Sequence, residues 1–401
     1  MTRGRYFVVV GLFILSLITY IDRVCISSAK GPIAADLGLS DEAMGIVFGA
    51  FALGYALGQV PSGMFADRFG PRLALSAVVI VWSAFTALTG AVRGFHTMVA
   101  VRFLFGVGEA GAFPGSARAI YNWLPIHERG RANGILFSGS RLGGALAFPI
   151  LVWLEAAMGW RWAFVVLGAA GIVWAAIWWG LFRDHPAGAP PPPPRATAAV
   201  NWKAALHAPH IVPACVQYFA SNFTFFICLS WMHPYLIRRF DLTAGEAAGY
   251  AMVPLLAGAG AQWTAGFFVD LLYRSGLRTW SRRLPAIAGF ALAALGVWAV
   301  TLADSPRAAI VFFAFATFGA DMTISPSWAF CADVGKESAA TVSGFMNMWG
   351  NFGSFVSASV FPVLLDWTGS ATAYFQLAAL LNIAAIAAWT RMRSVASGLP
   401  S

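Results

Sequence analysis

Long stretches without a charged residue recur along the chain and determine its predicted structure. There are seven such stretches without Asp, Glu, Lys or Arg, at residues 43–66, 73–92, 162–182, 247–269, 284–303, 338–365 and 367–390. A helix of about 20 apolar residues crosses a hydrocarbon core roughly 30 Å thick. The stretches exceed strand length and lack the polar alternation of a barrel strand. They therefore predict membrane-spanning helices.

Twelve helices account for this pattern over the whole chain. We expect them at residues 6–29, 43–65, 73–92, 96–121, 131–155, 161–182, 208–236, 246–269, 284–303, 307–330, 339–365 and 371–390. The proline run from Pro190 to Pro194 follows the sixth helix, and proline cannot continue a helix. The predicted domains are an N-terminal six-helix bundle at 1–183, a cytoplasmic linker at 184–207 and a C-terminal six-helix bundle at 208–401.

The two halves repeat one another in sequence. Gly63-Met-Phe-Ala-Asp67, after the second helix, recurs as Gly266-Phe-Phe-Val-Asp270 after the eighth. A duplicated six-helix unit explains this recurrence together with the central linker. The predicted fold class is therefore an all-α integral membrane protein with twelve transmembrane helices in two pseudo-symmetric halves.

The composition supports a membrane protein and argues against a nucleic-acid partner. Hydrophobic residues make up 59% of the chain and charged residues only 11%, against about a quarter in soluble domains. The net charge is +9, but most Lys and Arg fall in turns that this topology places in the cytoplasm. We therefore expect both termini in the cytoplasm and the protein in the bacterial inner membrane. The segment after Arg5 lacks a cleavage site, which favours a retained first span over a secretory signal.

No pattern in the sequence indicates a metal or a cofactor. The cysteines are scattered through or beside apolar helices, at Cys25, Cys215, Cys228 and Cys331. They form no CxxC pair and no cluster with histidine, which argues against disulfides and zinc. Gly106, Gly108 and Gly111 satisfy GxGxxG, but no strand precedes them, so a dinucleotide site is not expected.

The most specific motif lies in the turn between the second and third helices, where the chain reads Gly63-Met-Phe-Ala-Asp67-Arg68-Phe-Gly70-Pro-Arg72. This motif resembles the loop signature of the major facilitator superfamily. With twelve spans and a central linker, the resemblance covers essentially the whole chain. In that family the loop steadies one of two alternating conformations, so the resemblance implies a gating role. The alternative is an ordinary positive-inside turn.

Charged residues inside predicted helices are the candidates for a binding site. Asp22 and Arg23 adjoin in the first helix, and Arg102 and Glu109 share one face of the fourth. Each charge costs roughly 2.5 to 3.5 kcal/mol at the bilayer centre, so each must face a partner or a wet cavity. Neighbouring helical residues point about 100° apart, so Asp22 and Arg23 cannot face the same partner. The alternative is an internal salt bridge that only fixes helix packing.

This combination of charges resembles the anion:cation symporter family within that superfamily, which includes bacterial sugar-acid:proton symporters. The resemblance implies that Arg23 and Arg102 bind the substrate carboxylate and that Tyr55 donates a hydrogen bond to the substrate. It also implies that Asp22 and Glu109 carry the coupling protons. The chemistry agrees with these roles, because a guanidinium fork suits a carboxylate and a buried carboxyl group titrates readily.

Other polar residues depart from the family pattern or extend it. Ser140 stands where galactonate-type carriers place a longer amide that reaches the sugar. Beside it, Arg141 adds a cation that either binds a second anionic group, snorkels, or pairs with an acidic neighbour. Asp321 is a third carboxylate within a helix, and it either neutralises Arg141, takes a proton or binds cargo. Asn351 either reaches the substrate or bonds to another helix.

The sequence predicts a secondary transporter that carries a small organic anion, such as a sugar acid, together with protons by alternating access. Protons on Asp22 and Glu109 would lessen their competition for the arginines and free these for the substrate. A channel or a non-transporting sensor with the same fold is the alternative. We expect no enzyme activity, because no helix supplies a nucleophile with a base and an orienting partner. The expected partners are the anion, protons and membrane lipid, and we expect a monomer without metal or cofactor.

Overall fold

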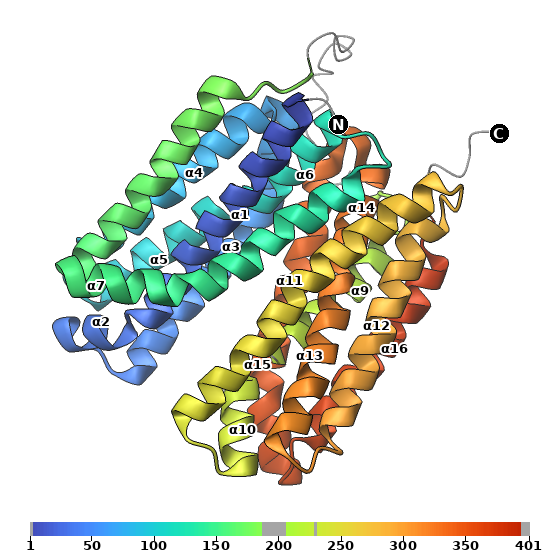
Figure 1. Ribbon diagram of the computed structural model, residues 1–401. Helices are drawn as coiled ribbons and strands as arrows, with labels where there is room; N and C mark the ends of the chain where they lie inside the picture. Colours follow the sequence, from blue (N-terminus) through green and yellow to red (C-terminus); the bar gives the residue numbers. More distant parts are fainter. Residues whose placement is uncertain (1–2, 187–205, 228–230, 394–401) are drawn as a thin grey trace. The chain divides into compact units, whose positions relative to one another are not determined.

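The computed structural model describes residues 3–186, 206–227 and 231–393, which form helices and turns without a strand (Figure 1). The proline run of the predicted linker lies outside the described residues. By their internal contacts the residues divide into two compact units. Unit 1 comprises Met1–Trp123, Leu142–His207 and Gly335–Phe345, and unit 2 comprises Leu124–Arg141, Ala208–Val334 and Met346–Ser401. Each unit therefore includes a short segment from the other half of the sequence.

Unit 1 is built from helices of the first half of the chain. They are α1 (Arg3–Ser28), α2 (Lys30–Leu37), α3 (Asp41–Phe69), α4 (Pro71–Thr89), α5 (Phe95–Glu109), α6 (Ala112–Trp123) and the later part of α7 (Arg129–Leu181). The helix α7 corresponds to two predicted helices, and Gly159 separates them with a non-helical backbone at φ 79° and ψ 161°. Glycine adopts such a positive φ without the steric penalty of a side chain. Unit 1 also includes the short 3₁₀ helix η2 (Lys336–Ser338) and the start of α15 (Ala339–Thr368).

Unit 2 contains the first turns of α7 and the remaining helices. They are α9 (Ile211–Phe226), α10 (Met232–Phe240), α11 (Ala244–Arg274), α12 (Trp280–Val300), α13 (Pro306–Met322), α14 (Ile324–Gly335), the later part of α15 and α16 (Thr372–Arg391). The helix α11 begins with a capping box in which Thr243 and Glu246 bond to each other's backbone N–H groups. Most helices lie at the predicted positions, with ends that differ by a few residues. The helix α2 lies in a predicted loop, and the predicted helix at 208–236 covers α9 and the first part of α10.

Two helices predicted as continuous are broken. The predicted helix at 96–121 consists of α5 and α6, with a break at Ala110 and Gly111. The predicted helix at 307–330 consists of α13 and α14, with a break at Thr323. Gly111 lies in the first break and Pro114 follows it, and Pro326 follows the second break; these helix-breaking residues were the signal in the sequence. Glu109 and Asp321 lie at or next to the last residue before a break, so each carboxylate is at a helix end inside its predicted span.

Glycines allow α5 to pack closely against its neighbours in unit 1. A Cβ atom at Gly106 would lie 2.3 Å from the Phe51 carbonyl oxygen of α3, and one at Gly108 would lie 2.9 Å from a Val81 side-chain carbon of α4. Both distances are shorter than a carbon atom tolerates, so only glycine permits this approach. The close packing brings the charged face of α5 against the aromatic residues of α3.

The outer faces of the helices are apolar. Leu57, Trp153 and Leu380 are 60%, 68% and 64% exposed. Large apolar side chains with this exposure need an apolar environment, which lipid provides. Among the described residues, eight helices are long and apolar enough to span a bilayer, and two of these, Pro149–Leu181 and Pro306–Thr368, each reach over parts of two predicted helices. The protein is therefore a multi-pass membrane protein.

Candidate functional site

The charged residues of α1 and α5 meet inside unit 1. The Arg23 side chain donates from Nε and Nη2 to Glu109 Oε1, at 3.1 and 2.8 Å. Glu109 is fully buried, and its other oxygen, Oε2, has no hydrogen-bond partner among the described residues. Arg23 retains 20% of its side-chain exposure. Glu109 therefore neutralises Arg23 with one oxygen and leaves the second available to a proton or a ligand.

Aromatic rings surround the two guanidinium groups of this site. The Arg23 Cζ atom lies 4.5 Å from the ring centre of Tyr55 and 5.2 Å from that of Phe51. The Arg102 Cζ atom lies 5.1 Å from the ring centre of Phe51 and 4.4 Å from that of Phe105. Cation–π contacts of this kind stabilise a desolvated cation without neutralising its charge. The structure therefore brings Tyr55 to the same site as both arginines.

Arg102 is the most unusual of these residues. It is only 1% exposed, yet it forms no hydrogen bond or ion pair with any residue in the described part of the chain. A buried charge that lacks a partner is strongly unfavourable. An anion with a fork-like pair of oxygens would satisfy this guanidinium.

Asp22 has a different partner from its neighbour Arg23. Its Oδ2 atom accepts a hydrogen bond from the Trp82 indole nitrogen at 3.1 Å. Its Oδ1 atom is buried and has no hydrogen-bond partner among the described residues. The two neighbours therefore point to different partners, as helical geometry predicts. Asp22 and Arg23 do not bond to each other, and the salt bridge of Arg23 is with Glu109 of α5.

The residues of the loop motif belong to a second polar site in unit 1, at the end of α3. Asp67 accepts hydrogen bonds from the backbone N–H groups of Ala340 and Thr341, at 3.1 and 2.8 Å, and from the Thr341 hydroxyl at 2.6 Å. The carboxylate thus caps the first turn of α15, where unpaired N–H groups and the helix dipole favour a negative charge. A Cβ atom at Gly63 would lie 2.6 Å from the Ala340 carbonyl oxygen, so glycine allows this approach.

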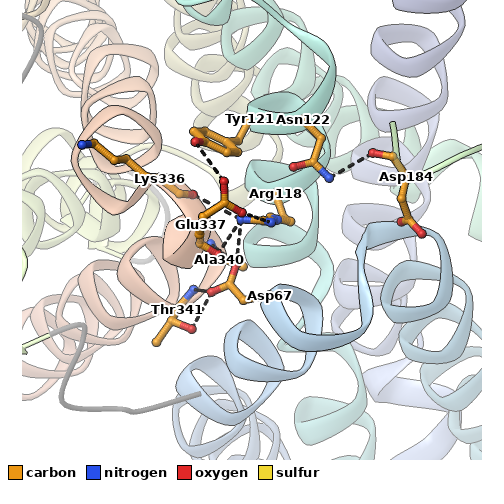
Figure 2. A network of polar contacts seen from close by, with 9 residues as sticks. All are labelled: Asp67, Arg118, Tyr121, Asn122, Asp184, Lys336, Glu337, Ala340 and Thr341. Carbon is orange, nitrogen blue, oxygen red and sulfur yellow. Dashed lines mark hydrogen bonds and ion pairs between the residues drawn. The ribbon is translucent and has the colours of Figure 1, made fainter. Parts of the chain in front are cut away.

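Arg118 joins Asp67 to Glu337, as Figure 2 shows. Its Nη1 atom lies 3.8 Å from Asp67 Oδ1, and its Nη2 atom donates to Glu337 Oε2 at 2.7 Å. Its Nη1 atom also donates to the backbone carbonyls of Lys336 and Glu337. Arg118 therefore fixes η2 and the start of α15 against α6.

The other side of the motif is tied to the end of α7. Asp184 accepts a hydrogen bond from the Arg72 backbone N–H at 2.8 Å, and the Arg72 side chain donates to the Trp179 carbonyl from Nε and Nη2. Gly70 has φ 85°, and a side chain there would collide with Asp184. Arg68 contacts the ring of Phe69. Asp184 therefore caps α4 much as Asp67 caps α15.

The sequence comparison agrees with this loop geometry. Residues 12–358 match the sequence profile of the Major Facilitator Superfamily, which covers well over half of the chain. The chain belongs to this superfamily. Among solved structures, the human organic anion transporter MFSD10 is similar with a TM-score of 0.77 and 15% identity, over 97% of this chain and 100% of that one. At that identity the likeness supports the superfamily fold and nothing finer.

Two curated transporters are similar to this chain over most of their length. The probable sulfoacetate transporter SauU of Cupriavidus necator is 32% identical, over 96% of this chain and 93% of that protein. The D-galactonate transporter of Escherichia coli is 28% identical, over 96% of this chain and 94% of that protein. Their names describe carriers of acidic cargo.

The remaining predicted site residues of this superfamily member lie in unit 2. Arg141 forms a two-pronged ion pair with Asp321, and its Nε atom donates to Asp321 Oδ2 at 2.7 Å. Asn351 donates to the Asn347 carbonyl of its own helix at 2.8 Å. The Ser140 hydroxyl bonds to the Phe137 carbonyl of its own helix. Of the alternatives left open by the sequence, the structure shows Arg141 paired with an acidic residue.

Unit 2 repeats the capping device of the loop motif. Asp270, the counterpart of Asp67 in the sequence repeat, accepts hydrogen bonds from the backbone N–H groups of Gly130 and Arg131, at 2.9 and 3.0 Å. It thereby caps the first turn of α7. The repeated motif Gly266 to Asp270 was the sequence signal for this site.

A charged cluster beside Asp270 was not foreseen from the sequence. Asp333 accepts from Arg129 at 2.7 Å and lies 3.1 Å from an Arg282 nitrogen. From the sequence, Arg129 and Arg282 belong to the basic residues expected on the cytoplasmic side, without a specific partner. Their acidic partners lie far away in the sequence, so spacing alone gave no signal of these pairs.

Proposed function

We propose that this protein is a proton-coupled symporter of a small organic anion, such as a sugar acid or a related carboxylate, and works by alternating access. The observation that supports this most is Arg102, a buried cation that forms no ion pair among the described residues, although the carboxylates of Asp22 and Glu109 lie near enough to attract it. A carboxylate of the cargo would supply the missing ion-pair partner. The acidic cargoes in the names of its relatives point to the same chemistry.

The residues of unit 1 divide into cargo-binding and proton-carrying groups. Arg102 binds the cargo carboxylate. Arg23 also binds the cargo once its ion pair with Glu109 is broken. Tyr55 lies against the Arg23 guanidinium and donates to a polar group of the cargo. Arg141 and Asn351 of unit 2 are the further candidates for cargo contact.

Glu109 and Asp22 are the proton carriers of this proposal. Each has one carboxylate oxygen without a hydrogen-bond partner in the described residues. A proton on Glu109 weakens its attraction for Arg23, and the freed cation then attracts the cargo anion. Loss of the proton restores the competition and favours release. Asp321 holds Arg141 in unit 2 and is the third candidate carrier.

The loop motif Gly63, Asp67, Arg68, Gly70 and Arg72 is the proposed gate. Asp67 ties α3 to the first turn of α15, and α15 continues from unit 1 into unit 2. A change of conformation that separates these segments must break the cap, so the strength of the cap sets the balance of two states. We place the protein in the bacterial inner membrane with both termini in the cytoplasm.

The proposal is tested with purified protein in liposomes and a panel of organic acids. A symporter shows saturable uptake, counterflow of labelled acid, and accumulation that depends on an inward pH gradient at fixed membrane potential. A channel passes current without counterflow, and a sensor binds acid and transports none. Either of the last two results would contradict the proposal.

A further inference from the structure

The turn between α11 and α12 in unit 2 contains a pocket. The helix α11 ends at Arg274 and α12 begins at Trp280. The pocket has a volume of about 480 Å³, which lies within the range of ligand sites in proteins. Besides Gly276, it is lined by Leu277, Arg278, Thr279, Trp280, Arg283 and Arg393. The pocket therefore combines the turn with a residue that follows α16.

Three arginines line this pocket, and no carboxylate does. Arg283 donates from Nε to the Met392 carbonyl at 2.6 Å, but its Nη2 atom is buried and has no hydrogen-bond partner among the described residues. Arg393 lies near enough to Arg283 to repel it electrostatically. The pocket therefore gathers positive charge without an acidic side chain in its lining.

An excess of arginine on one side of the membrane does not by itself explain this pocket. The neighbouring arginines have acidic partners, since Arg274 lies 4.0 Å from Glu128 and Arg282 lies 3.1 Å from Asp333. Residues 394–401 contain no Asp or Glu. The positive-inside rule accounts for arginines in such turns, but not for three that line one pocket without a carboxylate. Like charges held close together are unfavourable unless an anion neutralises them.

Large apolar side chains adjoin the pocket. Leu277, Trp280 and Leu284 are 45%, 46% and 41% exposed. Leu284 lies four positions after Trp280 on α12, so the two side chains share one face of the helix. The Arg283 Cζ atom lies 5.7 Å from the Trp280 ring centre, and tryptophan is enriched where the hydrocarbon core meets the headgroups. Positive charge and exposed apolar surface therefore adjoin, as the headgroup and chains of a lipid do.

The start of α12 adds hydrogen-bond donors for an anion. Thr279 precedes α12 and makes no side-chain hydrogen bond that caps it. The first N–H groups of a helix lack partners within the helix and lie at the positive end of its dipole. Phosphate groups commonly bind at such positions. Since Thr279 and Trp280 both line the pocket, the pocket includes this helix start.

We propose that this pocket binds the phosphate group of an acidic membrane lipid, such as phosphatidylglycerol. Guanidinium groups match phosphate oxygens with two parallel hydrogen bonds. A soluble phosphate ester has the same charged group but no chains for Trp280 and Leu284 to contact, so the apolar side chains favour the lipid. Acidic lipids of the cytoplasmic leaflet attract basic groups near the membrane surface, and this turn is expected on that side. The inference goes beyond the proposed function and holds for any cargo.

A bound phosphate would join three segments of unit 2. Arg278 belongs to the turn, Arg283 to α12, and Arg393 to the chain after α16. The hydrogen bond from Arg283 to Met392 already links the last two segments. The phosphate neutralises the repulsion between Arg283 and Arg393. Because a ligand that binds only the folded state stabilises it, the lipid should raise the temperature of unfolding.

Lipid binding is measured on the full-length purified protein in a neutral detergent. Native mass spectrometry during a lipid titration gives the affinity of the first bound lipid, and thermal unfolding gives the stabilisation. Phosphatidylglycerol is compared with phosphatidylcholine of the same chains, whose ammonium group cancels its phosphate charge. The wild type should bind phosphatidylglycerol about 10-fold or more tightly than phosphatidylcholine, since each basic residue near the surface contributes a factor of about 5. Glycerol 3-phosphate, which has no chains, should neither stabilise the protein nor displace the lipid.

A matched pair of variants tests the pocket itself. Arg393→Gln removes an exposed arginine of the lining and should weaken phosphatidylglycerol binding about 5-fold. Arg391→Gln removes the same charge two positions away, at an exposed arginine outside the lining, and should change that affinity less than about 2-fold. Arg278→Gln combined with Arg393→Gln should remove most of the preference for phosphatidylglycerol. Without added lipid, all these proteins should unfold at the wild-type temperature, which shows that the fold is intact.

Three results would overturn the proposal. Equal affinity of the wild type for the two lipids would show that the pocket does not select an acidic headgroup. Equal losses in Arg391→Gln and Arg393→Gln would show a diffuse attraction to the basic surface and no defined site. Displacement of the lipid by glycerol 3-phosphate would assign the pocket to a soluble phosphate ester.

Discussion

Two polar sites of unit 1 differ in how completely their hydrogen bonds are filled. At the end of α3, both oxygens of Asp67 accept hydrogen bonds, and Arg118 beside it bonds through both Nη atoms, so that only its Nε lacks a partner among the described residues (Figure 2). Between α1 and α5, Arg102 has no ion-pair partner among the described residues, and one oxygen each of Asp22 and Glu109 is unfilled. A network in which nearly all hydrogen-bonding atoms have partners stabilises one arrangement. A network with unpaired donors and acceptors is suited to bind and release a ligand. The comparison separates the gate from the cargo site.

The largest effect is expected at Arg102. Arg102→Lys should weaken cargo binding by about 100-fold, because lysine cannot present two parallel donors to a carboxylate. The affinity is measured by counterflow over a range of acid concentrations. Arg93→Lys, at an exposed arginine in a turn, is the matched control and should leave affinity unchanged. Near-normal affinity in Arg102→Lys would remove this residue from the site.

The next effect concerns coupling at Glu109. Glu109→Gln keeps the size of the side chain but fixes a neutral state that resembles the protonated carboxyl group. Counterflow should continue, whereas accumulation driven by a pH gradient should fall by about 10-fold or more, as expected for loss of a positioned proton carrier. Both assays use the same liposomes. If Glu109 only stabilises α5 through Arg23, both activities should fall together.

A smaller effect on transport is expected at Asp67, in the network at the end of α3. Asp67→Asn weakens the charged cap of α15 and should slow turnover by several-fold, roughly the effect of losing about 1 kcal/mol from one conformation. The half-saturating acid concentration should change little, since Asp67 lies apart from the cargo residues of α1 and α5. Initial rates at several acid concentrations separate the two parameters. Normal turnover at saturating acid would contradict the gating role.

The smallest effect is expected at Glu337. Its side chain is 67% exposed, and exposed ion pairs contribute about 0 to 1 kcal/mol. Glu337→Gln should therefore change turnover less than about 2-fold. Comparison with Asp67→Asn in the same assay tests whether the buried cap, and not the outer ion pair, dominates the network. A larger defect in Glu337→Gln than in Asp67→Asn would reverse this order.

The sequence predicted the helices and the charged centre because both follow local rules. Runs of apolar residues located the helices, and the cost of a charge in lipid singled out Asp22, Arg23, Arg102 and Glu109. The breaks after Glu109 and after Met322 were missed, because Gly111, Pro114 and Pro326, which mark them, are also tolerated inside unbroken membrane helices.

The partners of the charged residues could be predicted only in part. Helical geometry indicated that Asp22 and Arg23 face different ways, but not that their partners are Trp82 and Glu109, respectively. Arg118 and Glu337 are more than 200 positions apart in the sequence, and they lie near helix ends where positive charge is already expected. Such pairs depend on packing between distant segments, which a single sequence does not reveal.

The central claim is that the cargo anion moves together with protons, and the direct test is proton movement in liposomes that contain the purified protein and an external pH indicator. The account predicts that adding a transported acid makes the external medium alkaline at a rate that saturates with acid concentration. Arg102→Lys should abolish this signal at the same acid concentration. Saturable acid uptake without any change in external pH would contradict proton coupling.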